Sequence, residues 1–301
     1  MLHTHTTPGS RRRRFREQLG SGRLLKIPGA INPYSAKLIE QAGFDAAYLS
    51  GAVLAADLGL PDIGLTTSTE VAARAQQVTR ATDLPVLVDA DTGFGEPMNA
   101  ARTLQLMEDA GLAGLHLEDQ VNPKRCGHLD GKTVVPREEM TRRLRAVIDG
   151  RRDPDFLIMA RTDARSVEGL DAAIDRAKAY VDAGADAIFP EALADEAEFE
   201  AFRRAVDVPL LANMTEFGKS RLLDAATLEN LGYNIALYPV TLFRLAMGAI
   251  EDGLRTLAVE GTQESLLPRM QTRSRLYEVL GYEDYDTFDS AVFNFTLPPG
   301  N

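Results

Sequence analysis

Short runs of β-branched and leucine residues alternate with helical segments along most of this 301-residue chain, and this alternation constrains its fold most strongly. Eight runs have the length and composition of buried strands. They are Leu24–Ile31, Ala46–Ser50, Pro85–Asp91, Gly114–Asp119, Phe156–Thr162, Ala187–Glu191, Pro209–Met214 and Ile235–Pro239. Between them lie segments with the apolar spacing of amphipathic helices, such as Met98–Ala110, Glu138–Asp149 and Leu170–Ala183.

Eight consecutive strand–helix units are what a (β/α)8 barrel requires, and about 250 residues is its usual size. We therefore predict an α/β fold of this class, a TIM barrel. Residues 1–20 are expected to form a flexible N-terminal arm, and residues 21–301 a single barrel domain with a C-terminal helical extension. That extension is the additional helical segment Gln263–Leu280, followed by a polar tail.

A doubly wound open sheet is the alternative architecture. It would be supported by a glycine-rich nucleotide-binding turn, but the two candidate turns are incomplete. Gly20-Ser21-Gly22 lacks the third glycine at the required offset, and Gly218-Lys219-Ser220 lacks the first glycine of a phosphate loop. The sequence therefore favours the barrel.

Composition limits the compartment and the partners. A single cysteine excludes an internal disulfide, so nothing favours an oxidising compartment, and we expect a cytoplasmic protein. No apolar run is long enough to span a membrane, and the basic run Arg11–Arg14 has no apolar stretch behind it. The net charge of −11 argues against nucleic acid as a partner. An anionic substrate would need a local cluster of arginines, lysines or a metal ion.

Polar side chains stand at the C-terminal ends of nearly all the predicted strands, where (β/α)8 barrels carry their active sites. They are Tyr48, Ser50, Asp89, Asp91, His116, Glu118, Arg161, Asp163, Glu191, Asn213 and Thr215, with Arg244 beyond the eighth strand. Residues two apart in a strand point to one face. Asp89 and Asp91 should therefore face the barrel interior together.

Two inward carboxylates at one level repel each other unless a cation lies among them. Oxygen ligands without cysteine or paired histidines favour Mg²⁺, or Mn²⁺, over zinc. The alternative for Asp89 and Asp91 is an ion-paired cluster with Arg161 and Lys124. His116 is expected to orient ligands rather than to bind the metal directly.

The run Lys124-Arg125-Cys126-Gly127-His128 holds the only cysteine of the chain. Its charged neighbours predict a partly exposed thiol with a lowered pKa rather than a buried, inert one. Arg161 and Arg244 could each bind a carboxylate bidentately, and a metal ion could stabilise an alkoxide or enolate. Together these groups indicate a small polycarboxylate substrate and reversible C–C cleavage, with Cys126 exchanging a proton. Nucleophilic catalysis by Cys126, with His128 as its base, stays open.

These residues resemble the isocitrate lyase/phosphoenolpyruvate mutase superfamily. The motifs that carry the resemblance are Lys124–His128, Val88–Gly95 and Leu115–Gln120, supported by Tyr48–Gly51, Leu58–Asp62, Met159–Ala164, Phe189–Ala192 and Met270–Arg273. The resemblance extends from about residue 24 to 290 and is strongest to members that cleave (2S,3R)-2-methylisocitrate to pyruvate and succinate, in the methylcitrate cycle of propionate breakdown. It implies a Mg²⁺-dependent barrel and a homotetramer whose subunits exchange the eighth helix.

The resemblance also implies roles for individual residues. Asp89 and Asp91 would hold the metal, with Glu118 and His116 reaching it through water. Cys126 would protonate the succinate aci-carboxylate, within a catalytic motif that includes Lys124 and His128, and Tyr48 or a metal-bound water would be the base. The residues that would contact the tricarboxylate substrate are Ser50, Gly51, Ala52, Gly127, Arg161, Glu191, Asn213, Met214, Thr215, Arg244 and Arg273.

Other functions in the superfamily remain open. Many relatives have three glycines after the serine of the second strand, whereas this chain has Ser50-Gly51-Ala52-Val53. Isocitrate lyases usually carry long insertions that 301 residues do not accommodate, but short relatives act on 2,3-dimethylmalate or oxaloacetate. Phosphonate mutases usually lack the cysteine motif. A non-catalytic carboxylate-binding protein is disfavoured because it would need no acidic thiol.

Overall fold

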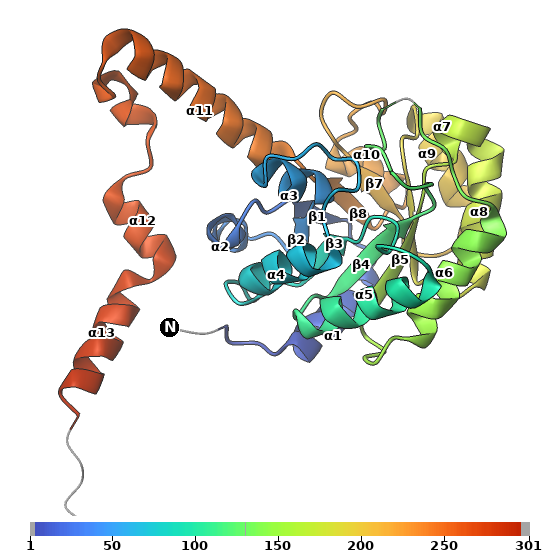
Figure 1. The fold of residues 1–301 in the computed structure, drawn as a ribbon, viewed down its shortest axis with the longest axis horizontal. Helices are drawn as coiled ribbons and strands as arrows, with labels where there is room; N and C mark the ends of the chain where they lie inside the picture. Colours follow the sequence, from blue (N-terminus) through green and yellow to red (C-terminus); the bar gives the residue numbers. More distant parts are fainter. Residues whose placement is uncertain (1–3, 130, 296–301) are drawn as a thin grey trace, which may run out of the picture. The chain divides into compact units, whose positions relative to one another are not determined.

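A computed structural model describes residues 4–129 and 131–295, and within them eight parallel strands are present (Figure 1). The strands are β1 (Leu25–Pro28), β2 (Ala47–Leu49), β3 (Val86–Asp89), β4 (Gly114–Glu118), β5 (Leu157–Thr162), β6 (Ala187–Pro190), β7 (Leu211–Asn213) and β8 (Ile235–Tyr238). Each lies within one of the eight predicted runs. The described residues divide into two compact units, Thr6–Arg244 and a second one made mainly of residues from Leu245 onward.

The strands of the larger unit close into a barrel. Strands β2 to β6 pair in sequence order, and β1, β8 and β7 form a second parallel set. Two isolated bridges, Gly29 with Tyr48 and Ile188 with Leu210, join the sets. A Cβ atom at Gly29 would lie 2.0 Å from the Pro239 carbonyl oxygen, so only glycine permits the close approach of the chain beyond β1 to that beyond β8. The predicted (β/α)8 barrel is confirmed.

Helices cover the outside of the barrel (Figure 1). They bury apolar faces against the outer side of the strands, as Ala100, Leu104 and Met107 of α5 do. The helices up to the end of the larger unit are α2 (Pro33–Gln41), α3 (Gly51–Asp57), α4 (Ser68–Thr79), α5 (Pro97–Asp109), α6 (Arg137–Asp149), α7 (Arg165–Glu168), α8 (Leu170–Asp182), α9 (Glu196–Ala205), α10 (Ala225–Asn230) and the start of α11 (Thr241–Glu260).

The N-terminal segment is a helix rather than the expected flexible arm. Helix α1 (Pro8–Leu19) places Phe15 and Leu19 in the apolar cluster inside the barrel, beside the first residues of several strands. The spacing of four between these two residues, one helical turn, was a signal for this helix. The prediction of a flexible arm was therefore wrong for residues 8–19.

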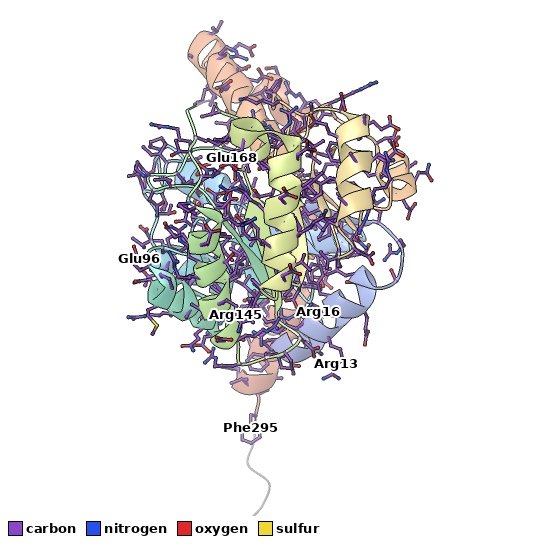
Figure 2. All side chains as sticks on the ribbon, turned by 90° about the vertical axis from the view of Figure 1, so that its right-hand side faces the viewer. Arg13, Arg16, Glu96, Arg145, Glu168 and Phe295 are labelled. Carbon is purple, nitrogen blue, oxygen red and sulfur yellow. The ribbon has the colours of Figure 1, made fainter. Side chains whose placement is uncertain are left out.

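The arginines of α1 explain why a basic segment packs here. Arg11 donates to the backbone carbonyls of Thr79 and Thr82, and Arg12 to those of Leu112 and Glu108. These carbonyls lie at or just beyond the C-terminal ends of α4 and α5, where helix carbonyls have no partner within the helix and favour cations. Figure 2 shows the neighbouring Arg13 and Arg16 at the same end of the unit.

The smaller unit contains the rest of α11, a 3₁₀ helix (Glu264–Arg269), α12 (Arg273–Leu280) and α13 (Tyr282–Phe293). The predicted helix over Gln263–Leu280 is thus interrupted, because Pro268 lacks an amide hydrogen and residues 270–272 are extended or irregular. The predicted polar tail holds α13 instead, which follows Gly281 at a φ of +66°. Exchange of a helix between subunits stays a prediction. No helix in the described ranges is long and apolar enough to cross a membrane.

Removing the aromatic ring of α1 should destabilise the barrel without touching the polar strand ends. Phe15 is fully buried, so Phe15→Ala should lower the free energy of unfolding by about 3–5 kcal/mol. Phe217→Ala removes a phenyl ring from a side chain that is 92% exposed. This substitution should change the free energy of unfolding by less than about 0.5 kcal/mol. Thermal and urea unfolding measure both, and equal effects would show that α1 is not part of the core.

Candidate active site

Two carboxylates meet at the C-terminal end of β3. Asp89 ends the strand, and Asp91 follows in a turn with a φ of +46°, so the turn brings them together rather than strand alternation alone. The α-carbon of Gly51 faces both, since a Cβ there would lie 3.0 Å from Asp89 Oδ2 and 3.4 Å from Asp91 Oδ1. Lys124 Nζ lies 2.9 Å from Asp91 Oδ1 and also contacts Asp62. Burial and the adjacent Asp89 raise the pKa of Asp91 to about 6, against the opposing effect of Lys124.

Tyr48 and His116 lie beneath this pair and contact each other. The Tyr48 hydroxyl is 2.8 Å from His116 Nε2, and His116 Nδ1 is 3.8 Å from Asp89 Oδ1. Burial raises the pKa of Tyr48 well above its ordinary value and lowers the pKa of His116 to about 4. Both groups are therefore neutral at neutral pH, which disfavours Tyr48 as the catalytic base.

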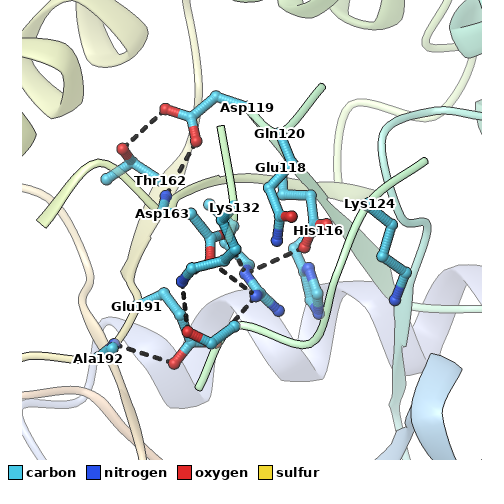
Figure 3. A network of polar contacts seen from close by, with 12 residues as sticks. His116, Glu118, Asp119, Gln120, Lys124, Lys132, Thr162, Asp163, Glu191 and Ala192 are labelled. Atoms are coloured by element: carbon cyan, nitrogen blue, oxygen red, sulfur yellow. Dashed lines mark hydrogen bonds and ion pairs between the residues drawn. The ribbon is translucent and has the colours of Figure 1, made fainter. Parts of the chain in front are cut away.

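Arg161, on β5, stands among three buried carboxylates, Glu118, Asp163 and Glu191, which are labelled in Figure 3. Its Nε lies 3.1 Å from Glu118 Oε2 and 2.9 Å from Asp163 Oδ2, and its Nη2 lies 3.1 Å from Glu191 Oε2. Its Nη1 takes part in none of these three contacts. The sequence suggested that Arg161 binds a substrate carboxylate through two hydrogen bonds. This bidentate binding would require one of the three carboxylates to move, whereas a single hydrogen bond from Nη1 requires no such movement.

The loop that carries Cys126 packs against this cluster. The thiol is half-buried, which agrees with the predicted partial exposure. Its pKa, however, is raised rather than lowered, because burial outweighs a hydrogen bond from the His128 backbone amide. The neighbouring cations are directed elsewhere, since Lys124 turns to Asp91 and Asp62 and Arg125 is exposed. Arg161 lowers the pKa of the thiol, but less than burial raises it. The prediction of an acidified thiol was wrong, and Cys126 holds its proton at neutral pH.

His128 uses both ring nitrogens for contacts away from the thiol. Nδ1 accepts a hydrogen bond of 2.9 Å from the backbone amide of Lys219, so the ring proton lies on Nε2. Nε2 is 2.9 Å from Glu191 Oε1, which also accepts from the Asn213 amide at 3.2 Å. His128 is therefore not placed as a base for Cys126 but joins its loop to the ends of β6 and β7.

Gly127 and Lys132 complete the packing of the loop. A Cβ at Gly127 would lie 2.4 Å from Arg161 Nη2 and 2.6 Å from Glu191 Oε2, so only glycine fits against this pair. Lys132 Nζ donates to the Gly127 carbonyl and to Asp163 Oδ1 at 2.8 Å. Sequence reasoning missed Lys132, because an isolated lysine in a polar loop gives no signal that it is buried.

The remaining predicted residues divide into two groups. Ser50 caps α3, Gly51 and Thr215 are buried, and Ala52 is half-buried at the same end of the barrel. Met214 points the opposite way, into the outer core, where its sulfur accepts from the Leu223 amide. The alternation of side chains along β7 excludes it from the site once Asn213 faces inward.

The two arginines predicted from the C-terminal part of the chain are placed differently. Arg244 Nε lies 3.6 Å from Glu216 Oε2, and its guanidinium stacks over Phe217 rather than joining Arg161. Arg273 begins α12 in the smaller unit and is exposed. A role for Arg273 in the site therefore stays a prediction.

The acidic residues fit a hard divalent cation held by few protein ligands. The nearby oxygens of Asp89 and Asp91 could bind it directly, and the buried Glu118 Oε1 has no hydrogen-bond partner in the described residues. No group of three or more His, Cys, Asp or Glu side chains with metal-binding geometry occurs within residues 4–129 and 131–295. Carboxylate oxygens are ligands that Mg²⁺ prefers, and Mg²⁺ keeps several positions for water and substrate oxygens.

Comparison with known proteins identifies the family. The model of a family described as phosphoenolpyruvate phosphomutase matches residues 15–258. The chain belongs to this family. Members that resemble it include a probable 2-methylisocitrate lyase of Corynebacterium glutamicum, 61% identical over 98% of this chain and 96% of the relative. The 2-methylisocitrate lyase of Escherichia coli is 50% identical over 90% of this chain and 93% of its own length.

Solved structures of phosphoenolpyruvate mutase relatives share the fold. An oxaloacetate acetylhydrolase bound to 3,3-difluorooxalacetate superposes with a TM-score of 0.90 at 32% identity, covering 97% of this chain and 100% of the other. A 2,3-dimethylmalate lyase gives 0.87 at 31% identity, with 98% and 99% covered. A phosphonopyruvate hydrolase in complex with oxalate and Mg²⁺ gives 0.85 at 28% identity, with 95% and 99% covered.

The raised pKa of Cys126 predicts how its alkylation depends on pH. Iodoacetamide reacts with thiolate, so the rate should be low at pH 7 and reach half its maximum above about pH 8.5, the ordinary value for a free thiol. Cys126 is the only cysteine, so mass spectrometry of the intact protein reports it alone. N-acetylcysteine amide, which has no carboxylate, is the control, and a Cys126 midpoint below that of this free thiol would contradict the structure.

Proposed function

We propose that this chain is a Mg²⁺-dependent carbon–carbon lyase that cleaves 2-methylisocitrate to pyruvate and succinate. The observation that carries the proposal is the packing of the Cys126 loop against Arg161 and Glu191 at the carboxylate-rich end of the barrel, where burial raises the pKa of the thiol. A thiol that keeps its proton suits a general acid better than a nucleophile. The relatives with high identity over nearly the full chain support the substrate.

The metal would be held by Asp89 and Asp91, with Glu118 and His116 reaching it through water. Once bound, Mg²⁺ supplies Lewis-acid stabilisation to the oxygens of the 2-hydroxy acid. Lys124, which pairs with Asp91, balances the charge of this carboxylate cluster. Mn²⁺ is the expected substitute.

The residues of the chain would act as follows. Arg161 Nη1 and the Gly127 amide bind substrate carboxylates, and Ser50, Gly51 and Ala52 contact the pyruvate half. A base removes the proton of the 2-hydroxyl, the C2–C3 bond breaks, and C2 becomes the carbonyl carbon of pyruvate. The electron pair of the broken bond passes to C3 as the aci-carboxylate of succinate. Cys126 then donates its proton to that carbon.

Oxaloacetate and 2,3-dimethylmalate are the alternative candidate substrates, because two solved relatives at 31–32% identity are named for enzymes that act on them. Higher identity over nearly the whole chain favours 2-methylisocitrate. A non-catalytic binding protein would not need Cys126 fixed beside Arg161. In the cell we propose a cytoplasmic enzyme of propionate catabolism.

We propose a homotetramer in which C-terminal helices are exchanged between subunits. The smaller unit exposes many large apolar side chains, more than a solvated surface normally carries. They include Leu245, Ile250, Leu254, Leu257, Leu276, Tyr285, Phe288 and Phe293. Sedimentation equilibrium should give the mass of four 32.8 kDa chains, and a stable monomer would refute the assembly.

The substrate is tested by coupled assay of pyruvate release from 2-methylisocitrate and from isocitrate. We expect rapid, EDTA-sensitive release that Mg²⁺ restores. One methyl group is worth about 1–3 kcal/mol in a pocket, so isocitrate should be cleaved about 10- to 200-fold less efficiently. No pyruvate from the methylated substrate would move the function to another acid of the family.

The general acid is tested by Cys126→Ser. Serine keeps the size of the side chain but gives up its proton far less readily, so kcat should fall about 10²- to 10⁴-fold with an unchanged melting temperature. Leu129→Ala, at an exposed position of the same loop, is the control and should retain most activity. Substantial turnover by Cys126→Ser would remove the thiol from the mechanism.

A further inference from the structure

We propose that Lys132 is a positioning residue that aims the Gly127–His128 peptide group at the Cys126 thiol and couples it to Arg161 through Asp163. Lys132 donates to Asp163 and to the Gly127 carbonyl, so its effect passes through a shared carboxylate and the backbone. The inference rests on the proposed function for its catalytic consequence, but its geometric content does not depend on the substrate.

Lys132 is buried, and its ammonium is committed to two acceptors. Its side chain is 2% exposed, and its acceptors are Asp163 Oδ1 at 2.8 Å and the Gly127 carbonyl oxygen. A buried ammonium is tolerated only where such partners replace water. The lysine therefore fixes the Gly127 carbonyl relative to the end of β5.

Holding this carbonyl also orients an amide. The oxygen of Gly127 and the N–H of His128 belong to one peptide group, which is planar and trans, so they point in opposite directions. A hydrogen bond from the His128 backbone amide lowers the pKa of the Cys126 thiol, against the larger effect of burial. When Lys132 holds the oxygen, it thereby directs the N–H toward the thiol.

Asp163 is a rigid anchor for this arrangement (Figure 3). Its backbone amide donates to Asp119 Oδ1 at 2.9 Å, and Asp119 Oδ2 accepts from Thr162 and Tyr180 at 2.8 Å each. The Asp163 carboxylate accepts from Lys132 and Arg161 Nη2 on Oδ1, and from Arg161 Nε on Oδ2. The carboxylate of Asp163 therefore fixes the positions of two groups. One is the guanidinium of Arg161, which we propose binds substrate, and the other is the backbone beside Cys126, the proposed acid.

The test is Lys132→Met, which keeps the apolar stem and removes the ammonium. Asp163 remains paired with Arg161 in this variant, so the barrel should fold. Lys178→Met, at an exposed position of α8, is the matched control. The first readout is the pH dependence of Cys126 alkylation, which needs no substrate. Loss of the hydrogen bond to the sulfur should shift the midpoint upward by about one pH unit in Lys132→Met only.

The second readout is steady-state kinetics with 2-methylisocitrate. A displaced acid should lower kcat about 100-fold, while KM stays nearly constant because Arg161 and the acidic cluster are unchanged. Lys132→Arg, which retains a cation and donors, should recover part of kcat. If the role of Lys132 were purely structural, Lys132→Met would lower the melting temperature without a selective loss of kcat and without a shift of the alkylation midpoint.

A folded Lys132→Met protein with the wild-type alkylation midpoint overturns the proposal. If this variant does not fold, Lys132→Gln takes its place, because glutamine is neutral and too short to reach both acceptors. If neither Lys132→Met nor Lys132→Gln folds, Lys132 is a structural residue, and this result also overturns the proposal. Absence of pyruvate from the wild-type protein would instead refute the proposed function and leave the alkylation comparison valid.

Discussion

The buried guanidinium of Arg161 is the interaction on which the site depends. Three carboxylates from the ends of β4, β5 and β6 surround it, and each would be strongly disfavoured inside a barrel without a counter-charge. The reverse also holds, because an unpaired guanidinium would not remain buried. Gly127 then packs directly on the Arg161–Glu191 pair, so the cysteine loop takes its position from this charge cluster.

The loop is attached to the barrel by cations and a histidine that each reach a different acidic residue. Lys124 pairs with Asp91, His128 with Glu191 and Lys132 with Asp163. Burial has the largest effect on the pKa of the Cys126 thiol and raises it, against the opposing effects of the His128 backbone amide and of Arg161. The result is a protonated cysteine beside the cluster that we propose binds the substrate carboxylates and a metal ion, which is the combination that the proposed proton donation after C–C cleavage requires.

The opposite end of the barrel serves stability instead. There α1 fills the interior with Phe15 and Leu19, and its arginines bind carbonyls at the helix ends. The separation is a property of the architecture, since the strands direct catalytic groups to their C-terminal ends and leave the other end for packing. Substitutions in α1 and in the cysteine loop should accordingly affect different quantities, unfolding in one case and turnover in the other.

The sequence by itself determined the eight strands, the inward faces of Asp89, His116, Glu118 and Arg161, and the partial exposure of Cys126, because these follow from local periodicity and from neighbours along the chain. The same alternation would have excluded Met214, and the spacing of Phe15 and Leu19 would have indicated α1. Only the tertiary structure decided the raised pKa of Cys126, the turn of Lys124 toward Asp91, and the burial of Lys132. These depend on residues such as Asp163, 31 positions from Lys132, which become neighbours only when the barrel closes. Closure fixes which charges share a low-dielectric interior, and no local pattern contains that information.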